Sequence, residues 1–221
     1  MIARYDGLAE WYDQNLRDFT LTLGTGALER VLGRGPGECL DLGCGTGLHF
    51  ATLLELGWRV TGVDVSVDQL RVAAGRGDGR VELVRADAAV LPFEDGRFDA
   101  VAAVFVHTDF EDYEAALRES ARVLRPGGRL VHIGLHPCFV GPFSRYVGPD
   151  QPPELHAGYR DTGWTRDGPG LGQGLRRLVG TRHLPLADLL NATIASGLTL
   201  EHFEEPGETD YPRVFAFSAR R

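Results

Sequence analysis

The stretch "CLDLGCGTGLHF", residues 39–50, holds the residues best placed to bind a ligand. Three glycines, Gly43, Gly45 and Gly47, follow a short apolar run, so the backbone of the loop can approach a ligand closely. Dinucleotide-binding loops space their glycines as GxGxxG, whereas the spacing here is GxGxG. Asp41 precedes the first glycine, where a carboxylate repels a pyrophosphate and attracts an ammonium group. The loop therefore favours a ligand with a positive end.

Two further aspartates each follow an apolar run. Asp64, in "VTGVDVS", lies at the point where an acidic residue accepts hydrogen bonds from ribose hydroxyls. Asp87, in "VRADAAVLPFEDGRFD", can accept a hydrogen bond from an adenine amino group, with Val65 and Ala88 as apolar neighbours. A nucleoside with an amino-acid tail fits this set of carboxylates. The alternative is that each aspartate only caps the helix or turn that follows it.

A regular alternation of strands and helices positions these residues. Apolar runs typical of buried parallel strands occur at about 37–42, 58–63, 80–85, 98–106 and 129–135. Helix-like stretches occur at about 47–56, 66–75 and 111–124, and the last of them stops at "RPGG". This alternation predicts an α/β fold with a doubly wound sheet that is covered on both faces. Ligands of such sheets bind at the carboxyl ends of the strands.

Four motifs in this order, "LDLGCGTG", "GVDVS", "RADAAVLPFEDGRFDAV" and "RVLRPGGRLV", closely resemble those of the class I S-adenosylmethionine (SAM)-dependent methyltransferases. The resemblance covers roughly residues 39–135, and the N-terminal "YDGLAEWYD" and the C-terminal segment are also similar. It implies a mostly parallel, Rossmann-like seven-stranded sheet whose last strand is antiparallel. It also implies that SAM lies across the carboxyl ends of the first strands and leaves as S-adenosylhomocysteine.

The resemblance assigns roles to the residues of these motifs. Asp41 is expected to hold the methionine ammonium, Asp64 the ribose diol and Asp87 the adenine amine. The glycines are expected to permit close approach of the cofactor. Tyr5 and Tyr12 are expected to cover the methionine end, with ordinary helix packing as an equally good alternative. The expected cofactor-binding residues are therefore Tyr12, Asp41, Gly43, Gly45, Gly47, Asp64, Val65, Asp87 and Ala88.

Length and patterning indicate one methyltransferase domain over residues 1–221. Residues 1–34 are expected to form two N-terminal cap helices, at about 5–16 and 23–33. Residues 35–135 form the SAM-binding core, and residues 185–221 a terminal helix and two strands. Residues 136–184 break the pattern with glycine, proline and aromatic residues, as a substrate lid does. Six rings in this insertion are the expected acceptor contacts, unless they only pack the segment: Phe139, Phe143, Tyr146, His156, Tyr159 and Trp164.

Methylation of a hydroxyl group benefits from a base, and the seven histidines are the candidates. His136 and His107 are expected at the carboxyl ends of adjacent strands, with a structural hydrogen bond as the alternative for each. His183 is a weaker candidate at the end of the lid, and His156 a fourth. His132 is expected to be a core residue. His49 and His202 are expected to lie away from the cleft.

Composition limits the possible partners. With 23 basic and 31 acidic residues the net charge is −8, which disfavours nucleic acid and anionic lipid as partners. All the basic residues are arginine, which we interpret as genome composition. The three cysteines have no metal-type spacing, and no leader or spanning segment is recognisable. We therefore expect a cytoplasmic protein without a metal, and the sequence does not predict its oligomeric state.

These observations predict a SAM-dependent methyltransferase that acts on oxygen, nitrogen or carbon of a small molecule, plausibly a specialised metabolite. One alternative is a SAM-binding protein that uses the fold for another reaction or has lost methyl transfer. A further alternative, an NAD-dependent oxidoreductase, is disfavoured by the glycine spacing and by Asp41.

Overall fold

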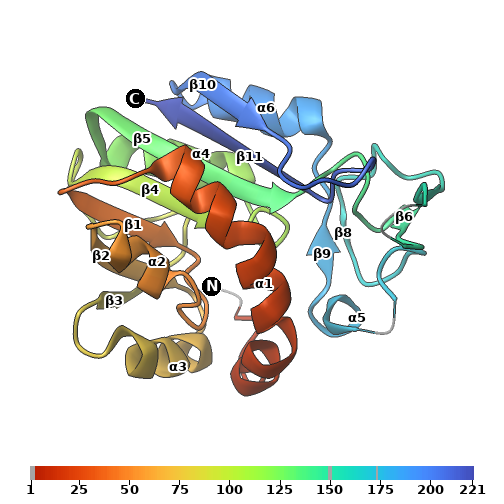
Figure 1. The fold of residues 1–221 in the computed structure, drawn as a ribbon, viewed down its shortest axis with the longest axis horizontal. Coiled ribbons are helices and arrows are strands. Elements are labelled where there is room, and N and C mark those ends of the chain that lie inside the picture. The colour runs from red at the N-terminus through yellow and green to blue at the C-terminus, as the bar shows by residue number, and fades with distance from the viewer. Residues whose placement is uncertain (1–2, 149–150, 173) are drawn as a thin grey trace.

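A seven-stranded sheet forms the centre of the computed structural model, which describes residues 3–148, 151–172 and 174–221 (Figure 1). The strands lie in the order β10-β11-β5-β4-β1-β2-β3. β11 is antiparallel to both of its neighbours, whereas the pairs among β1 to β5 are parallel. The predicted doubly wound sheet with an antiparallel last strand is confirmed. Its strands are β1 (Glu38–Leu42), β2 (Arg59–Asp64), β3 (Glu82–Arg85), β4 (Phe98–Val104), β5 (Leu124–Leu135), β10 (Thr199–Glu204) and β11 (Val214–Arg220).

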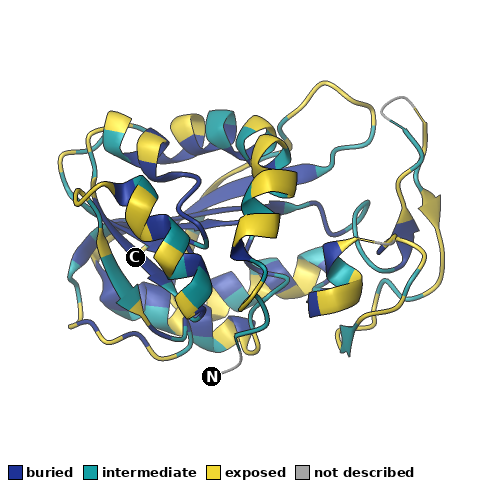
Figure 2. Ribbon diagram, turned by 90° about the horizontal axis from the view of Figure 1, so that it is seen from below, coloured by how far each residue is buried: buried dark blue, intermediate teal, exposed yellow. Residues whose placement is uncertain are grey.

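Helices cover both faces of the sheet. One core cluster joins α1 (Ala9–Leu32), α2 (Phe50–Glu55) and α3 (Val67–Gly77) to one face, and a second joins α4 (Tyr113–Val123) and α6 (Leu186–Ala195) to the other. The central strands are buried, and the outward sides of the helices are exposed (Figure 2). Burial on both sides explains why the inner strands are continuous apolar runs. In the described part of the chain, no helix is both long and apolar enough to span a bilayer.

Local capping explains where two of these helices begin. The side chain of Ser66 accepts a hydrogen bond from the backbone N–H of Gln69 at the start of α3, and Asp112 accepts one from Ala115 at the start of α4. These contacts satisfy backbone donors that the first turn of a helix leaves free. The carboxyl end of β2 thus lies directly before a helix, and that of β4 is followed by residues 105–112 and then α4; ligand sites are expected at such strand ends.

The N-terminal segment differs from the prediction of two cap helices, because α1 runs without a break from Ala9 to Leu32. Gly24 and Gly26 lie inside this helix, although glycine disfavours a helix interior. A Cβ atom on Gly24 would lie 2.9 Å from the His49 ring and 3.1 Å from the Phe105 ring. Tertiary packing therefore explains Gly24: the helix continues through it and approaches those two rings closely.

The described residues of the segment 136–184 lie beyond the carboxyl end of β5, to one side of the sheet (Figure 1). They contain the hairpins β6 (Ser144–Arg145) with β7 (Glu154–Leu155) and β8 (Trp164–Thr165) with β9 (Thr181–Arg182), and the short helix α5 (Leu175–Val179). The backbone N–H of Arg182 donates to the carbonyl of Thr108, 2.9 Å away, and so joins the insertion to the loop after β4.

Candidate functional site

The three glycines after β1 have left-handed backbone conformations, with φ of 69° at Gly43, 54° at Gly45 and 76° at Gly47. Side chains rarely tolerate this region, which explains the residue type at all three positions. A Cβ on Gly43 would lie 2.7 Å from Val106, and one on Gly47 would lie 2.4 Å from the Phe50 ring. A Cβ on Gly45 would make only an ordinary contact, 3.5 Å from Gln69 Oε1. Gly45 is therefore the least crowded of the three glycines.

A cavity opens at the carboxyl ends of β1, β2 and β4, above this loop. Of the nine predicted cofactor-binding residues, eight line it: Tyr12, Asp41, Gly43, Gly45, Asp64, Val65, Asp87 and Ala88. Gly47 is not among its lining residues and packs against α2 instead. The three predicted carboxylates thus line one cavity, because the carboxyl ends of the parallel strands meet at the same edge of the sheet.

Asp41 is the most unusual polar group of the cavity. Its carboxyl group is 3% exposed, and Oδ2 has no hydrogen-bond partner among the described residues. The pKa of Asp41 is raised to about 7, first by burial and then by the charge of Asp64. A buried carboxylate without a partner is costly, and a cationic group at this position removes the cost. The site therefore suits a ligand ammonium group.

Asp64 is held by two backbone donors. Oδ2 accepts from the N–H of Gly45 and Oδ1 from the N–H of Ser66, each at 2.9 Å. Burial raises the pKa of Asp64, and these N–H groups oppose the rise. Each carboxylate oxygen keeps a second lone pair, so both can accept a further hydrogen bond from vicinal hydroxyls.

Asp87 lies at the next strand end. Its Oδ1 accepts a hydrogen bond from the N–H of Ala89 at 2.9 Å, which is the turn-capping contact that the alternative reading anticipated. Asp87 nevertheless lines the cavity together with Val65 and Ala88. One aspartate therefore stabilises its own turn at the wall of the cavity.

The N-terminal segment covers the cavity with two tyrosines. The Tyr5 and Tyr12 rings pack edge to face with centroids 5.8 Å apart. Tyr5 donates a hydrogen bond to Asp109 Oδ1 at 2.9 Å, and Arg176 pairs with the same carboxylate at 2.5 Å. Arg176 comes from the insertion, so an ion pair joins that segment to two residues of the cavity wall, Tyr5 and Asp109. The sequence held no signal for this contact between distant segments.

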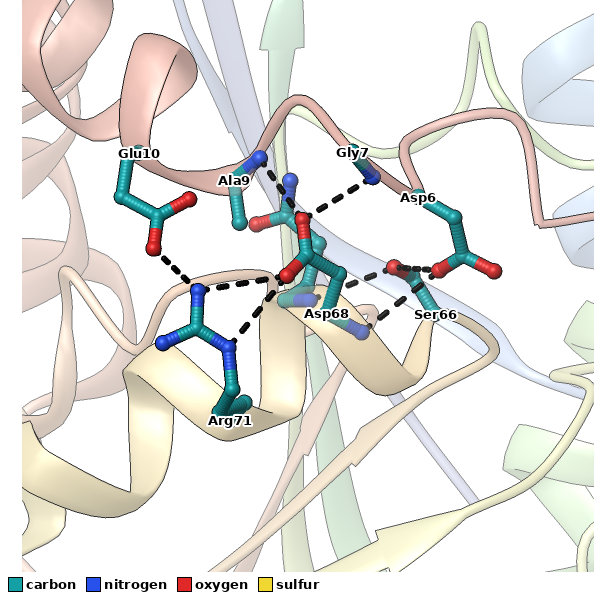
Figure 3. A network of polar contacts seen from close by, with 8 residues as sticks. Asp6, Gly7, Ala9, Glu10, Ser66, Asp68 and Arg71 are labelled. Atoms are coloured by element: carbon teal, nitrogen blue, oxygen red, sulfur yellow. Dashed lines mark hydrogen bonds and ion pairs between the residues drawn. The ribbon is translucent and has the colours of Figure 1, made fainter.

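A second polar network holds the start of α1 against α3 (Figure 3). Asp68 Oδ2 accepts hydrogen bonds from the backbone N–H groups of Gly7 at 3.0 Å and Ala9 at 3.2 Å. Ser66 donates to Asp6 at 2.5 Å, and Arg71 pairs with both Asp68 and Glu10. The cover over the cavity is therefore fixed to the helix that follows Asp64.

Replacement of Asp68 by alanine removes both contacts to the start of α1, so we expect faster hydrogen exchange at the backbone amides of residues 7–12 and a severalfold loss of SAM affinity. Glu114→Ala is the matched control, because Glu114 is an acidic residue in the first turn of α4. Exchange mass spectrometry and calorimetry measure the two effects. Equal exchange in the two variants would show that the network does not hold the cover.

The three predicted catalytic histidines do not line this cavity in the described part of the chain. His107 is buried under the backbone of Gly134, where a Cβ would lie 2.5 Å from its ring, and burial lowers its pKa well below the ordinary value. His132 is buried in the core, as predicted, but neither ring nitrogen has a hydrogen-bond partner among the described residues, and burial lowers its pKa to about 3. His183 packs against the rings of Phe143 and Tyr159, at centroid distances of 5.0 and 5.3 Å.

His136 has partners for both ring nitrogens. Nε2 lies 2.7 Å from Glu205 Oε1, and Nδ1 accepts a hydrogen bond from the N–H of Cys138 at 3.2 Å. The proton therefore resides on Nε2 in the neutral ring, and the residue fixes the start of the insertion. A role of His136, His107 or His183 as a base stays a prediction, without a contact to the cavity that supports it.

His49 corrects the sequence analysis, which placed it away from the cleft. It lies at the N-terminal boundary of α2, is 6% exposed and lines the cavity. Neither ring nitrogen has a hydrogen-bond partner among the described residues, and burial lowers its pKa to about 4. The imidazole is therefore neutral at pH 7. Helical periodicity could not reveal this, because the orientation depends on the room left by Gly24 in α1.

The six aromatic side chains predicted to bind the acceptor lie outside the lining of this cavity, as far as the structure describes the chain. Phe143 and Tyr159 pack against each other at a centroid distance of 5.5 Å, and Phe139 packs against His136 at 4.9 Å. His156 is exposed. Two of the rings make cation–π contacts with arginine guanidinium groups. The guanidinium of Arg213 lies 4.1 Å from the centroid of Tyr146, and that of Arg4 lies 3.6 Å from the centroid of Trp164.

Comparisons with known proteins agree with this geometry. A family model described as a methyltransferase domain matches residues 40–132. Demethylmenaquinone methyltransferases of Mycolicibacterium paratuberculosis and Thermus thermophilus are 44% and 42% identical over 58% and 53% of this chain. The chain spans 56% of the length of each of these curated relatives. A crystal structure of a SAM-dependent methyltransferase from Mesorhizobium loti is similar, with 28% identity, a TM-score of 0.71 and coverage of 84% of this chain and 91% of that one.

The fold and the carboxylate-lined cavity define a nucleoside-binding α/β protein of the Rossmann-like type. Residues 40–132 match a methyltransferase-domain family, and the whole fold is similar to that of a SAM-dependent methyltransferase of known structure. The residues present fit SAM, because an unpaired buried carboxylate, a carboxylate with free lone pairs and a left-handed glycine line one cavity. No cluster of three histidine, cysteine, aspartate or glutamate residues suited to a metal occurs among the residues described.

Proposed function

We propose that this chain transfers a methyl group from SAM to an oxygen, nitrogen or carbon atom of a small molecule in the cytoplasm, and that the acceptor is a specialised metabolite. The observation that carries the proposal is the buried, unpartnered Asp41 beside Asp64 at the strand ends. The names of the curated relatives, demethylmenaquinone methyltransferases, support an acceptor of small-molecule size. The net charge of −8 supports a partner other than nucleic acid or an anionic membrane.

SAM supplies a methyl group on a positively charged sulfur, which is reactive towards electron-rich atoms. The residues of the chain would bind and align it. Asp41 holds the ammonium group, Asp64 the ribose hydroxyls and Asp87 the adenine amine. Tyr5 and Tyr12 exclude water from the cavity, which strengthens the electrostatic contacts inside it. Alignment of this kind accounts for a large part of the rate enhancement in two-substrate reactions.

The insertion at residues 136–184 is proposed to act as the lid over the acceptor. Arg176 supports this role, because its ion pair with Asp109 and its contact with Tyr5 at 3.1 Å reach the cavity wall. The six predicted aromatic residues would approach the acceptor only after movement of the insertion. Such a closure is common in enzymes that exclude water from the reaction.

The proposed activity is tested by incubating the protein with SAM and a pool of small metabolites, followed by mass spectrometry. We expect S-adenosylhomocysteine to accumulate only with the pool, together with a metabolite that carries one added methyl group. The variant Asp64→Ala should form much less of both. SAM that binds but yields no S-adenosylhomocysteine with any pool would favour a SAM-binding protein with another function.

A further inference from the structure

We infer that the end of the cavity formed by His49, Thr20 and Phe105 is the acceptor subsite, and that it binds a flat aromatic molecule through a hydroxyl group that donates to His49. The inference rests on the proposed function and deepens it, since it names the class of acceptor. All three residues line the same cavity as the predicted cofactor contacts.

His49 is a polar group directed at a ligand. It is almost fully buried, and neither Nδ1 nor Nε2 has a hydrogen-bond partner within the described ranges. Buried polar side chains nearly always have a partner, so an orphaned imidazole at a cavity wall indicates that a ligand supplies one. A neutral imidazole offers one lone pair and one N–H. It therefore accepts a hydrogen bond from a hydroxyl group readily.

The cofactor does not require His49. In the proposed function, its ammonium group binds Asp41, its ribose diol binds Asp64 and its adenine amine binds Asp87. These aspartates lie at or just after the carboxyl ends of β1, β2 and β3. Its carboxylate can use the side-chain amide of Gln69, which is buried, lines the cavity near Gly45 and also lacks partners among the described residues. His49 is left for the second substrate.

The ring of Phe105 lies beside His49 against α1. A Cβ on Gly24 would meet the rings of both His49 and Phe105, at 2.9 and 3.1 Å, so the two side chains lie together against α1. Phe19 supports Phe105 from behind at a centroid distance of 6.2 Å. Phe105 has a left-handed backbone with φ of 55°, which is held by its N–H bond to the carbonyl of Ile133 at 2.7 Å. Such strained residues cluster at ligand contacts.

This wall selects by shape and by hydrogen bonding. Aromatic side chains favour flat apolar ligands, which they contact over large areas. The His49 ring has one nitrogen that can accept a hydrogen bond. A ligand with a hydroxyl group is therefore favoured, because a ligand without a hydrogen-bond donor leaves this buried nitrogen without a partner. An aryl alcohol satisfies both requirements.

The test is calorimetry on the protein saturated with S-adenosylhomocysteine, with two matched pairs of probes: 1-naphthol against 1-methoxynaphthalene, and 4-nitrophenol against 4-nitroanisole. Each pair has the same ring system, and only the first member can donate a hydrogen bond. We expect at least one alcohol to bind about tenfold more tightly than its methyl ether. His49→Phe should abolish this preference, and His49→Gln, which keeps an acceptor, should restore part of it.

His202→Phe is the control, because His202 is an exposed residue on β10; it should keep the preference. Equal affinity for alcohols and ethers, or no binding of either alcohol, would overturn the inference while leaving the proposed function intact. A loss of S-adenosylhomocysteine affinity in His49→Phe would also overturn the inference, because it would assign His49 to cofactor binding. Failure of the wild-type protein to bind S-adenosylhomocysteine at all would instead remove the proposed function.

Discussion

Replacement of Asp64 by alanine lowers the affinity of the chain for SAM by about tenfold to a hundredfold. The carboxylate has one free lone pair on each oxygen for the ribose hydroxyls, and hydrogen bonds to a charged group contribute about 1.5 to 3 kcal/mol. The substitution also frees the N–H groups of Gly45 and Ser66, which orient the glycine loop and the start of α3. The lost hydrogen bonds to the ribose and the freed N–H groups both lower the affinity for SAM.

Calorimetry with SAM measures this loss. Asp18→Ala is the control, because Asp18 is an exposed acidic residue on the outer side of α1, and its SAM affinity should match that of the wild type. Thermal unfolding without ligand separates a weaker contact from a damaged fold. Unchanged SAM affinity in a folded Asp64→Ala protein would remove Asp64 from the site.

The pH dependence of SAM binding is expected to follow Asp41. The ammonium group binds the ionised carboxylate, whereas a pKa of about 7 leaves Asp41 mostly protonated below neutrality. Affinity should therefore fall by up to tenfold for each pH unit below 7 and reach a plateau above it. Asp41→Asn should bind SAM weakly at every pH, with this dependence removed. Calorimetry between pH 5.5 and 8.5 tests both statements.

The same pKa affects the stability of the ligand-free protein in the opposite sense. Above pH 7 the unfolded chain and the folded chain are both ionised at Asp41, and the folded form bears the cost of the buried charge. Between the ordinary pKa of 3.8 and about 7, stability falls as pH rises, by about 4 kcal/mol in total, since each pKa unit corresponds to about 1.4 kcal/mol. Thermal unfolding at pH 5 and pH 8 should show a smaller loss in Asp41→Asn than in the wild type. An equal loss of stability in the two proteins would contradict a raised pKa at Asp41.

The sheet and the cofactor end could be predicted because local patterns determine them. Buried strands are short apolar runs, and residues at their carboxyl ends converge at one edge of a parallel sheet. Asp41, Asp64 and Asp87 therefore reach one cavity, although they are far apart in the chain. Their roles towards SAM stay predictions until binding is measured.

The proposed acceptor end could not be predicted in the same way, because it depends on contacts between distant segments. Gly24 lay inside a predicted helix without a role, whereas in the structure its missing side chain admits the rings of His49 and Phe105. Arg176 carries no motif, yet it links the insertion to Asp109. Aromatic density in residues 136–184 indicated an acceptor pocket, but those rings pack among themselves and against nearby arginines. Composition alone does not distinguish these two uses of a ring.

The central claim is that the cavity above the glycine loop binds SAM, and calorimetric titration of SAM in the presence and absence of excess NAD tests it most directly. We expect one SAM per chain, with an affinity that NAD does not change. We also expect S-adenosylhomocysteine to compete fully, because it keeps the ammonium, diol and adenine groups that the three aspartates contact. A chain that binds NAD in place of SAM, or binds neither nucleoside, would contradict the account.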